Sequence, residues 1–170
     1  MTLDAAYEPP NTLPPLLRGL LTTTRERHVD MANLVSGLPP EGLDWQPFPE
    51  SASLAGLALH ILDVEDYLAA LASGDATEWS GENGSRMDET RSAEELLREI
   101  ERVDGRLVEA LEQVTLQRLS APQPGERRTV GQALVEDLDH SAMHYGHMQL
   151  TRHAWEVAHP GAPLTYAHWR

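Results

Sequence analysis

The chain has 170 residues, a formal net charge of −14 and no cysteine. The length suits one domain spanning 1–170, and the acidic charge disfavours nucleic acid as a partner because it repels a phosphate backbone. The lack of cysteine excludes disulfides, thiolate metal ligands and a cysteine nucleophile, so any metal ligands must be histidine or carboxylate side chains.

The first two predicted helices each carry a histidine at the edge of an apolar face. One helix is predicted over 13–37 and the next over 53–72, with His28 and His60 at the edges of their respective faces. Glu65 falls within the apolar stripe of the second helix. The stripe of the first helix consists of Leu13, Leu16, Leu17, Leu20, Met31, Leu34, Val35 and Leu38.

Two further helices follow a polar, Gly-rich segment over 74–91 that we interpret as a long loop. The third helix is predicted over 92–119 and the fourth over 129–157, each opened by a capping box. Four amphipathic helices without strands predict an all-α four-helix bundle, and the long loop leaves room for a crossover connection.

No apolar run approaches the ~20 residues that span a bilayer. The N-terminal segment MTLDAAYEPPNT lacks the basic and apolar parts of a secretion signal. We therefore expect a cytoplasmic protein with no membrane partner.

The segment HSAMHYGH, residues 140–147, places three histidines on one side of the fourth helix. At ~100° per residue, His140, His144 and His147 lie beside the buried stripe, where helix bundles build their cofactor sites. His140 and His144 are one turn apart, which suits chelation of a single ion. His147 lies ~10.5 Å along the axis from His140, so one ion rarely binds both.

A third ligand is expected from another helix, and His60 is the best candidate, with His28 as the second choice. Three neutral imidazoles leave an ion with an open coordination position, which is typical of catalytic sites. The plainer interpretation is that these histidines are hydrogen-bonded polar residues beside the core, with no metal. Glu65 is interpreted either as an acceptor for a ligating imidazole or as a structural partner of a backbone or tryptophan donor.

Two segments resemble the DinB-like superfamily of four-helix-bundle metalloproteins. DWQPFPESASLAGLALHILDVE, residues 44–65, is similar to the Trp-Pro segment of the family, which is followed by serine at the helix start and then by histidine. EDLDHSAMHYGHMQLTR, residues 136–152, resembles the family pattern His-x-x-x-His-x-Gly-(Gln/His) with a downstream arginine, here Arg152. The resemblance extends over nearly the whole chain.

The resemblance implies that His60, His140 and His144 hold zinc, nickel or iron, and that the protein forms a homodimer. It further implies a metal-dependent enzyme acting on a small molecule, either as an S-transferase that activates a low-molecular-weight thiol or as a hydrolase that activates water. Glu65 and His147 are the candidates for moving the proton. The alternative is a non-catalytic, metal-stabilised binding protein of a stress response.

Overall fold

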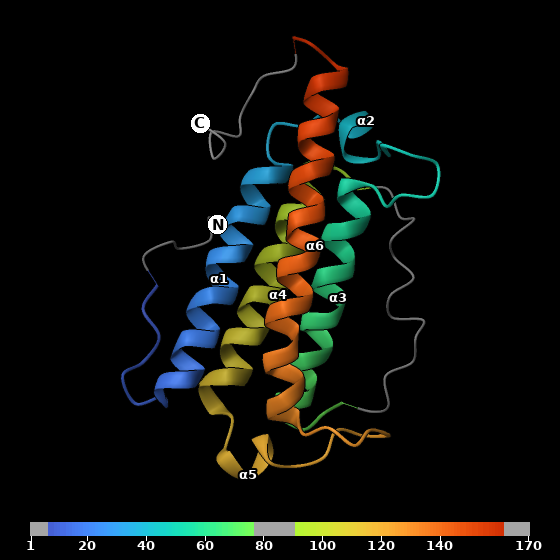
Figure 1. Ribbon diagram of the computed structural model, residues 1–170. Helices are drawn as coiled ribbons and strands as arrows, with labels where there is room; N and C mark the ends of the chain where they lie inside the picture. Colours follow the sequence, from blue (N-terminus) through green and yellow to red (C-terminus); the bar gives the residue numbers. More distant parts are fainter. Residues whose placement is uncertain (1–6, 77–90, 162–170) are drawn as a thin grey trace.

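A computed structural model describes residues 7–76 and 91–161, and its long elements are all helices. Four long helices form the bundle, and two short helices lie in its connections (Figure 1). The long helices are α1 (Pro15–Val35), α3 (Leu54–Ser73), α4 (Ala93–Gln113) and α6 (Val130–Ala158), and the short ones are α2 (Pro40–Leu43) and α5 (Leu116–Leu119).

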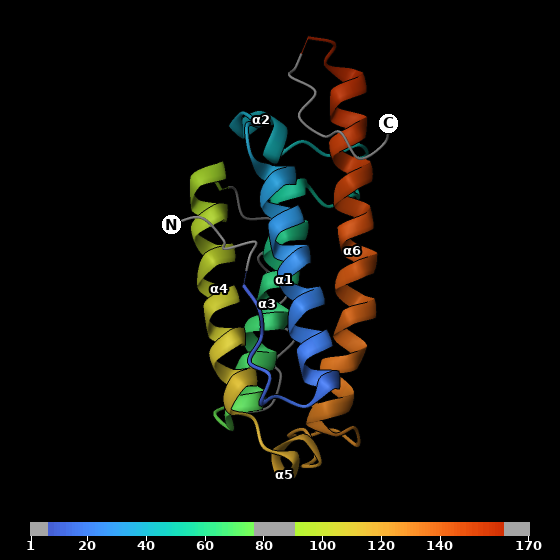
Figure 2. The ribbon, with the colours of Figure 1, turned by 90° about the vertical axis from the view of Figure 1, so that its left-hand side faces the viewer.

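Helices α1 and α6 run in one direction, and α3 and α4 run in the other (Figures 1 and 2). Helix α3 packs against α4 and α6, and α1 packs against the same two helices from the opposite side. Because α3 and α4 are parallel, the chain between them must return along the length of the bundle, which confirms the predicted crossover. Most of the predicted loop 74–91, residues 77–90, lies outside the described residues.

The core consists of two apolar clusters with a buried polar layer between them. One cluster contains Met31, Leu62, Val103 and Met148, and the other contains Leu21, Leu68, Leu107 and Leu134. Between these positions, each long helix contributes at least one buried polar side chain. The members of this polar layer are His28 on α1, Glu65 on α3, Asp104 on α4, and Asp137 and Ser141 on α6.

Local capping fixes where the two histidine-bearing helices begin. The Ser53 side chain accepts a hydrogen bond from the Gly56 N–H and starts α3. Thr129 and Gln132 form the predicted capping box at the start of α6, in which each side chain accepts from the other residue's backbone N–H. These caps fix the residue at which each helix begins, and the packing of α3 against α6 turns their histidines toward one another.

The predicted third helix over 92–119 is wrong at its C-terminal end, because α4 stops at Gln113 and α5 follows separately. Val114 adopts an extended conformation, with φ −63° and ψ 135°. The Thr115 side chain then accepts from the Arg118 N–H and begins a new turn. The other three long helices begin and end within two residues of their predicted bounds.

Leu16 corrects the predicted stripe of the first helix, since its side chain is 73% exposed. It lies in the first turn of α1 and is rotated ~100° from the buried Leu17, onto the outer face. Across residues 7–76 and 91–161, no helix has the length and apolar character needed to cross a bilayer.

Candidate metal centre

Helices α3 and α6 bring three histidines together near the middle of the bundle. We name His60, His140 and His144 the three-histidine cluster. The ring centroid of His60 lies 5.1 Å from that of His140 and 4.7 Å from that of His144. The rings of His140 and His144 are 4.6 Å apart. The one-turn spacing on α6 and the packing of α3 against α6 together produce this convergence.

The ring nitrogens of the cluster are spaced as the ligands of one ion require. One nitrogen from each ring lies within 4.8 Å of the other two, and the Nε2 atoms of His60 and His140 are 3.1 Å apart. Two nitrogens bound ~2.0–2.1 Å from a tetrahedral ion are ~3.3 Å apart. The Nδ1 atoms of all three rings are buried and make no hydrogen bond within the described residues. The donor set and its spacing therefore fit a divalent cation.

Burial and the neighbouring imidazoles favour the neutral forms of His60 and His144. Burial, followed by the charge of His140, lowers the pKa of His60. Burial, followed by the charges of the neighbouring histidines, lowers the pKa of His144 to about 4. Only a neutral imidazole offers a lone pair to a metal, so His60 and His144 need little deprotonation before they can bind a cation at neutral pH.

Asp137 also belongs to the site, and it was absent from the sequence-based candidates. Its Oδ1 lies 3.4 Å from His140 Nδ1, an ion-pair distance that is long for a hydrogen bond. Burial raises the pKa of Asp137 to about 6. Carboxylates at this position on an imidazole often orient it toward a metal. The available signal was the spacing: Asp137 precedes His140 by three residues and shares its helix face.

His147 and His28 do not join the three-histidine cluster. His147 is exposed, with its ring centroid 5.5 Å from that of His144. His28 is completely buried rather than at the edge of its helix face, and both of its ring nitrogens have carboxylate partners. His28 is therefore unsuited to be the third ligand.

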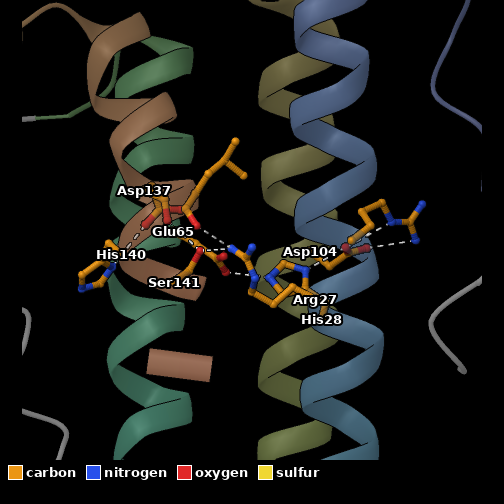
Figure 3. Close-up of polar contacts among 9 residues, drawn as sticks. Arg27, His28, Glu65, Asp104, Asp137, His140 and Ser141 are labelled. Atoms are coloured by element: carbon orange, nitrogen blue, oxygen red, sulfur yellow. Dashed lines mark hydrogen bonds and ion pairs between the residues drawn. The ribbon is translucent and has the colours of Figure 1, made fainter. Parts of the chain in front are cut away.

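Glu65 contacts His28 rather than a ring of the cluster or a tryptophan (Figure 3). Glu65 Oε2 lies 2.6 Å from His28 Nε2, and Asp104 Oδ1 lies 2.9 Å from His28 Nδ1. Arg25 forms an ion pair with the same Asp104. Its Nε and Nη2 atoms each lie 3.1 Å from one carboxylate oxygen of Asp104. The polar layer thus contains a chain of alternating charge that crosses from α3 through α1 to α4.

The α6 side of the polar layer is joined to α1 by an arginine. Arg27 donates to the Ser141 hydroxyl and to the Leu138 carbonyl at 3.2 Å (Figure 3). Arg152, the downstream arginine of the sequence pattern, donates to the Leu34 carbonyl at 2.9 Å and to Glu156 at 2.8 Å. It therefore ties α6 to the end of α1.

A cavity of about 400 Å³ opens beside the three-histidine cluster. His60 and His140 form part of its wall, together with other residues of α3 and α6 and the hairpin over 121–130. Its volume is within the ~300–1,000 Å³ of small-molecule sites. The cluster is therefore accessible to a small ligand.

Metal-free protein should lose stability through His144 as the pH falls from about 6.5 to about 4. The folded-state pKa of His144 is about 4, below its ordinary value of 6.5, so the unfolded chain binds a proton more readily in this interval. The contribution is complete above pH 6.5 and declines toward pH 4. Urea denaturation of chelator-treated wild type and His144→Gln at several pH values measures it. A difference between the two proteins that is constant with pH would contradict this assignment.

The model of the DinB superfamily matches residues 22–148, which include all three clustered histidines. Among solved structures, a DinB-like protein from Bacillus subtilis has a TM-score of 0.62 at 19% sequence identity. That alignment covers 86% of this chain and 96% of the other, and it shows a shared fold. No curated protein sequence gives a significant match. With three-quarters of its length inside the family match, the chain belongs to the DinB superfamily.

Proposed function

We propose that the protein binds one divalent metal ion through the three-histidine cluster and is an enzyme that activates a low-molecular-weight thiol or water. The observation that carries the proposal is the convergence of the His60, His140 and His144 ring nitrogens within 4.8 Å. Three imidazoles leave a coordination position open for a further ligand. Zinc, nickel and iron all accept such a ligand set.

A divalent ion supplies one chemical property here, a lowered pKa of a bound thiol or water that yields a nucleophile near neutral pH. The protein's own residues do the rest. Asp137, with Oδ1 3.4 Å from His140 Nδ1, is placed to orient the ring of His140 once it binds the ion. The buried helix faces fix His60 and His144, and the adjacent cavity gives a substrate room to approach.

The proton released from the nucleophile needs a route to solvent. His147 is exposed and its ring centroid is 5.5 Å from that of His144, so it is the better placed of the two sequence-based candidates. Glu65 is committed to His28. In thiol transfer, the sulfur–carbon bond forms as the electrophile's leaving group departs with the electron pair, and the thiol proton passes to His147 or to water.

Metal analysis of protein purified without a polyhistidine tag is the first test. We expect close to one divalent ion per chain, removed by a chelator and restored by reloading. Metal-loaded and metal-free protein are then compared for turnover with a thiol and an electrophile, and with ester and amide substrates. We expect turnover only in the loaded form.

The outcomes separate the candidate functions. A metal content near zero that reloading does not raise would contradict metal binding by the three-histidine cluster, and the proposed activity with it. Stoichiometric metal without turnover of any of these substrates would favour the non-catalytic, metal-stabilised binding protein. Turnover with esters or amides but not with thiols would assign the open position to water.

A further inference from the structure

The cavity beside the three-histidine cluster is lined by both polar and apolar side chains. Tyr67 lies seven residues after His60 on α3, which places it ~10 Å along the helix from the cluster. Gln123 and Arg128 line the cavity as well. Gln123 Nε2 is 3.4 Å from the Tyr67 hydroxyl, so Gln123 is at the end of the cavity remote from His60. The apolar side chains of Val64 and Leu68 also line the cavity.

A short hairpin holds Gln123 and Arg128 in place. The Gln123 N–H donates to the Arg128 carbonyl at 2.9 Å, and the Val130 N–H donates to the Ala121 carbonyl at 3.0 Å. Gly125 makes the turn with φ 74°, a conformation that favours glycine. The two polar side chains are therefore presented on an ordered backbone that leads directly into α6.

Both side chains keep polar atoms that the described residues do not satisfy. Gln123 is 2% exposed, and its Oε1 is buried without a hydrogen-bond partner among the described residues. Arg128 Nε is likewise buried without one. A buried polar atom left unpaired costs ~1–3 kcal/mol, so such atoms lining a cavity indicate a ligand that pairs with them. Gln123 Oε1 requires an N–H or O–H donor, and Arg128 Nε requires an acceptor.

The Arg128 side chain is 41% exposed, and the acidic residues around it, which include Glu126 at 3.8 Å, disfavour a multiply charged acceptor. Arg128 already donates to Glu136 at 2.6 Å, and Glu136 and Asp137 both line the cavity. A doubly charged phosphate would be repelled by these two acidic residues, whereas a carboxylate matches the planar guanidinium and carries one charge. A donor beside a carboxylate is the arrangement at the C-terminal residue of a peptide.

We propose that this cavity binds the non-reacting end of the substrate, and that this end is an amide N–H next to a carboxylate. The inference rests on the proposed function for the reacting end, which lies at the three-histidine cluster. Arg128 Nε pairs with the carboxylate, and Gln123 Oε1 accepts from the amide. The apolar lining residues Val64 and Leu68 contact methylene groups that connect the two ends, so the substrate class is a small peptide-like thiol or acyl compound.

The test uses two probes that differ only at this end. One is N-(6-mercaptohexanoyl)glycine, which ends in a carboxylate, and the other is N-(6-mercaptohexanoyl)glycinamide, which ends in a neutral amide. Titration calorimetry with metal-loaded wild type should show the acid binding about tenfold more tightly than the glycinamide. Arg128→Gln should abolish this preference without changing the metal content. Arg127→Gln, a change at the exposed neighbouring arginine, is the matched control and should keep the preference.

A second arm separates this proposal from the metal. In chelator-treated protein, hexanoylglycine, which lacks a thiol, should shift the side-chain amide resonances of Gln123 in wild type and leave them in place in Arg128→Gln. Equal affinity of loaded wild type for the two mercaptohexanoyl probes, together with no shift by hexanoylglycine, would overturn the proposal. Failure to load metal with a retained Gln123 shift would overturn the proposed function and leave the cavity assignment standing.

Discussion

Replacing His28 with leucine should destabilise the protein by about 3–5 kcal/mol, the cost of removing one partner from a buried ion pair. His28 is fully buried, with one carboxylate on each ring nitrogen. Asp104 keeps Arg25 in the variant, but Glu65 loses its ion-pair partner. Against a typical total stability of ~5–15 kcal/mol, a loss of this size is readily measured by urea denaturation.

The double variant His28→Leu/Glu65→Leu is the matched control. It removes both charges at this point of the polar layer and should regain most of the lost stability, because apolar side chains of similar volume often replace buried pairs without penalty. A single variant within about 1 kcal/mol of wild type would show that the pair contributes no more than an ordinary surface contact.

The same pair gives a distinct dependence on pH. Burial by itself lowers the pKa of His28, but the charge of Glu65 and the hydrogen bonds of Asp104 and Glu65 outweigh it and raise the pKa from 6.5 to about 10. A raised folded-state pKa contributes stability that is complete below pH 6.5 and is lost as the pH rises toward 10. Wild type should therefore lose stability over this interval more steeply than the double variant.

The helices were predictable because apolar periodicity and capping residues are local signals. Ser53 and Thr129 fix two helix starts from a few neighbouring residues. The end of α4 was not predictable in this way, since the apolar pattern continues through Val114. There the Thr115 side chain accepts from the Arg118 N–H and begins a new helical turn, an alternative to continuing α4 that the apolar pattern does not reveal.

The three-histidine cluster was predictable because a one-turn spacing on a core-facing side restricts where two rings can point. The partners of Glu65 and Asp137 were not. The helical periodicity of the sequence places Glu65 on the buried face of its helix. It does not reveal that the partner of Glu65 is His28, which lies on a different helix. Asp137 is recognised only once α6 is known to turn this face toward α3, because the same aspartate on an outer face would be an ordinary solvated charge.

Replacing His144 with alanine should weaken metal binding by about two orders of magnitude, because structural zinc sites gain ~10–16 kcal/mol from four ligands, or ~3 kcal/mol from each. The helical circular-dichroism signal should remain close to that of wild type. Both apolar clusters of the core are built without His144. Competition with a chromophoric chelator measures the affinity.

His153→Ala is the matched control for this experiment, because His153 lies on the same helix, is exposed, and is outside the three-histidine cluster. It should bind metal as wild type does.

If His144→Ala and His153→Ala bound metal equally well, the ion would have to be held elsewhere. If His144→Ala were unfolded, the ring would be part of the packing that holds α6 to α3, and His144→Gln would then be needed to keep that packing while removing the ligand. The expected result, a folded protein with about a hundredfold weaker metal binding, would show that His144 holds the ion and is not needed for the bundle to fold.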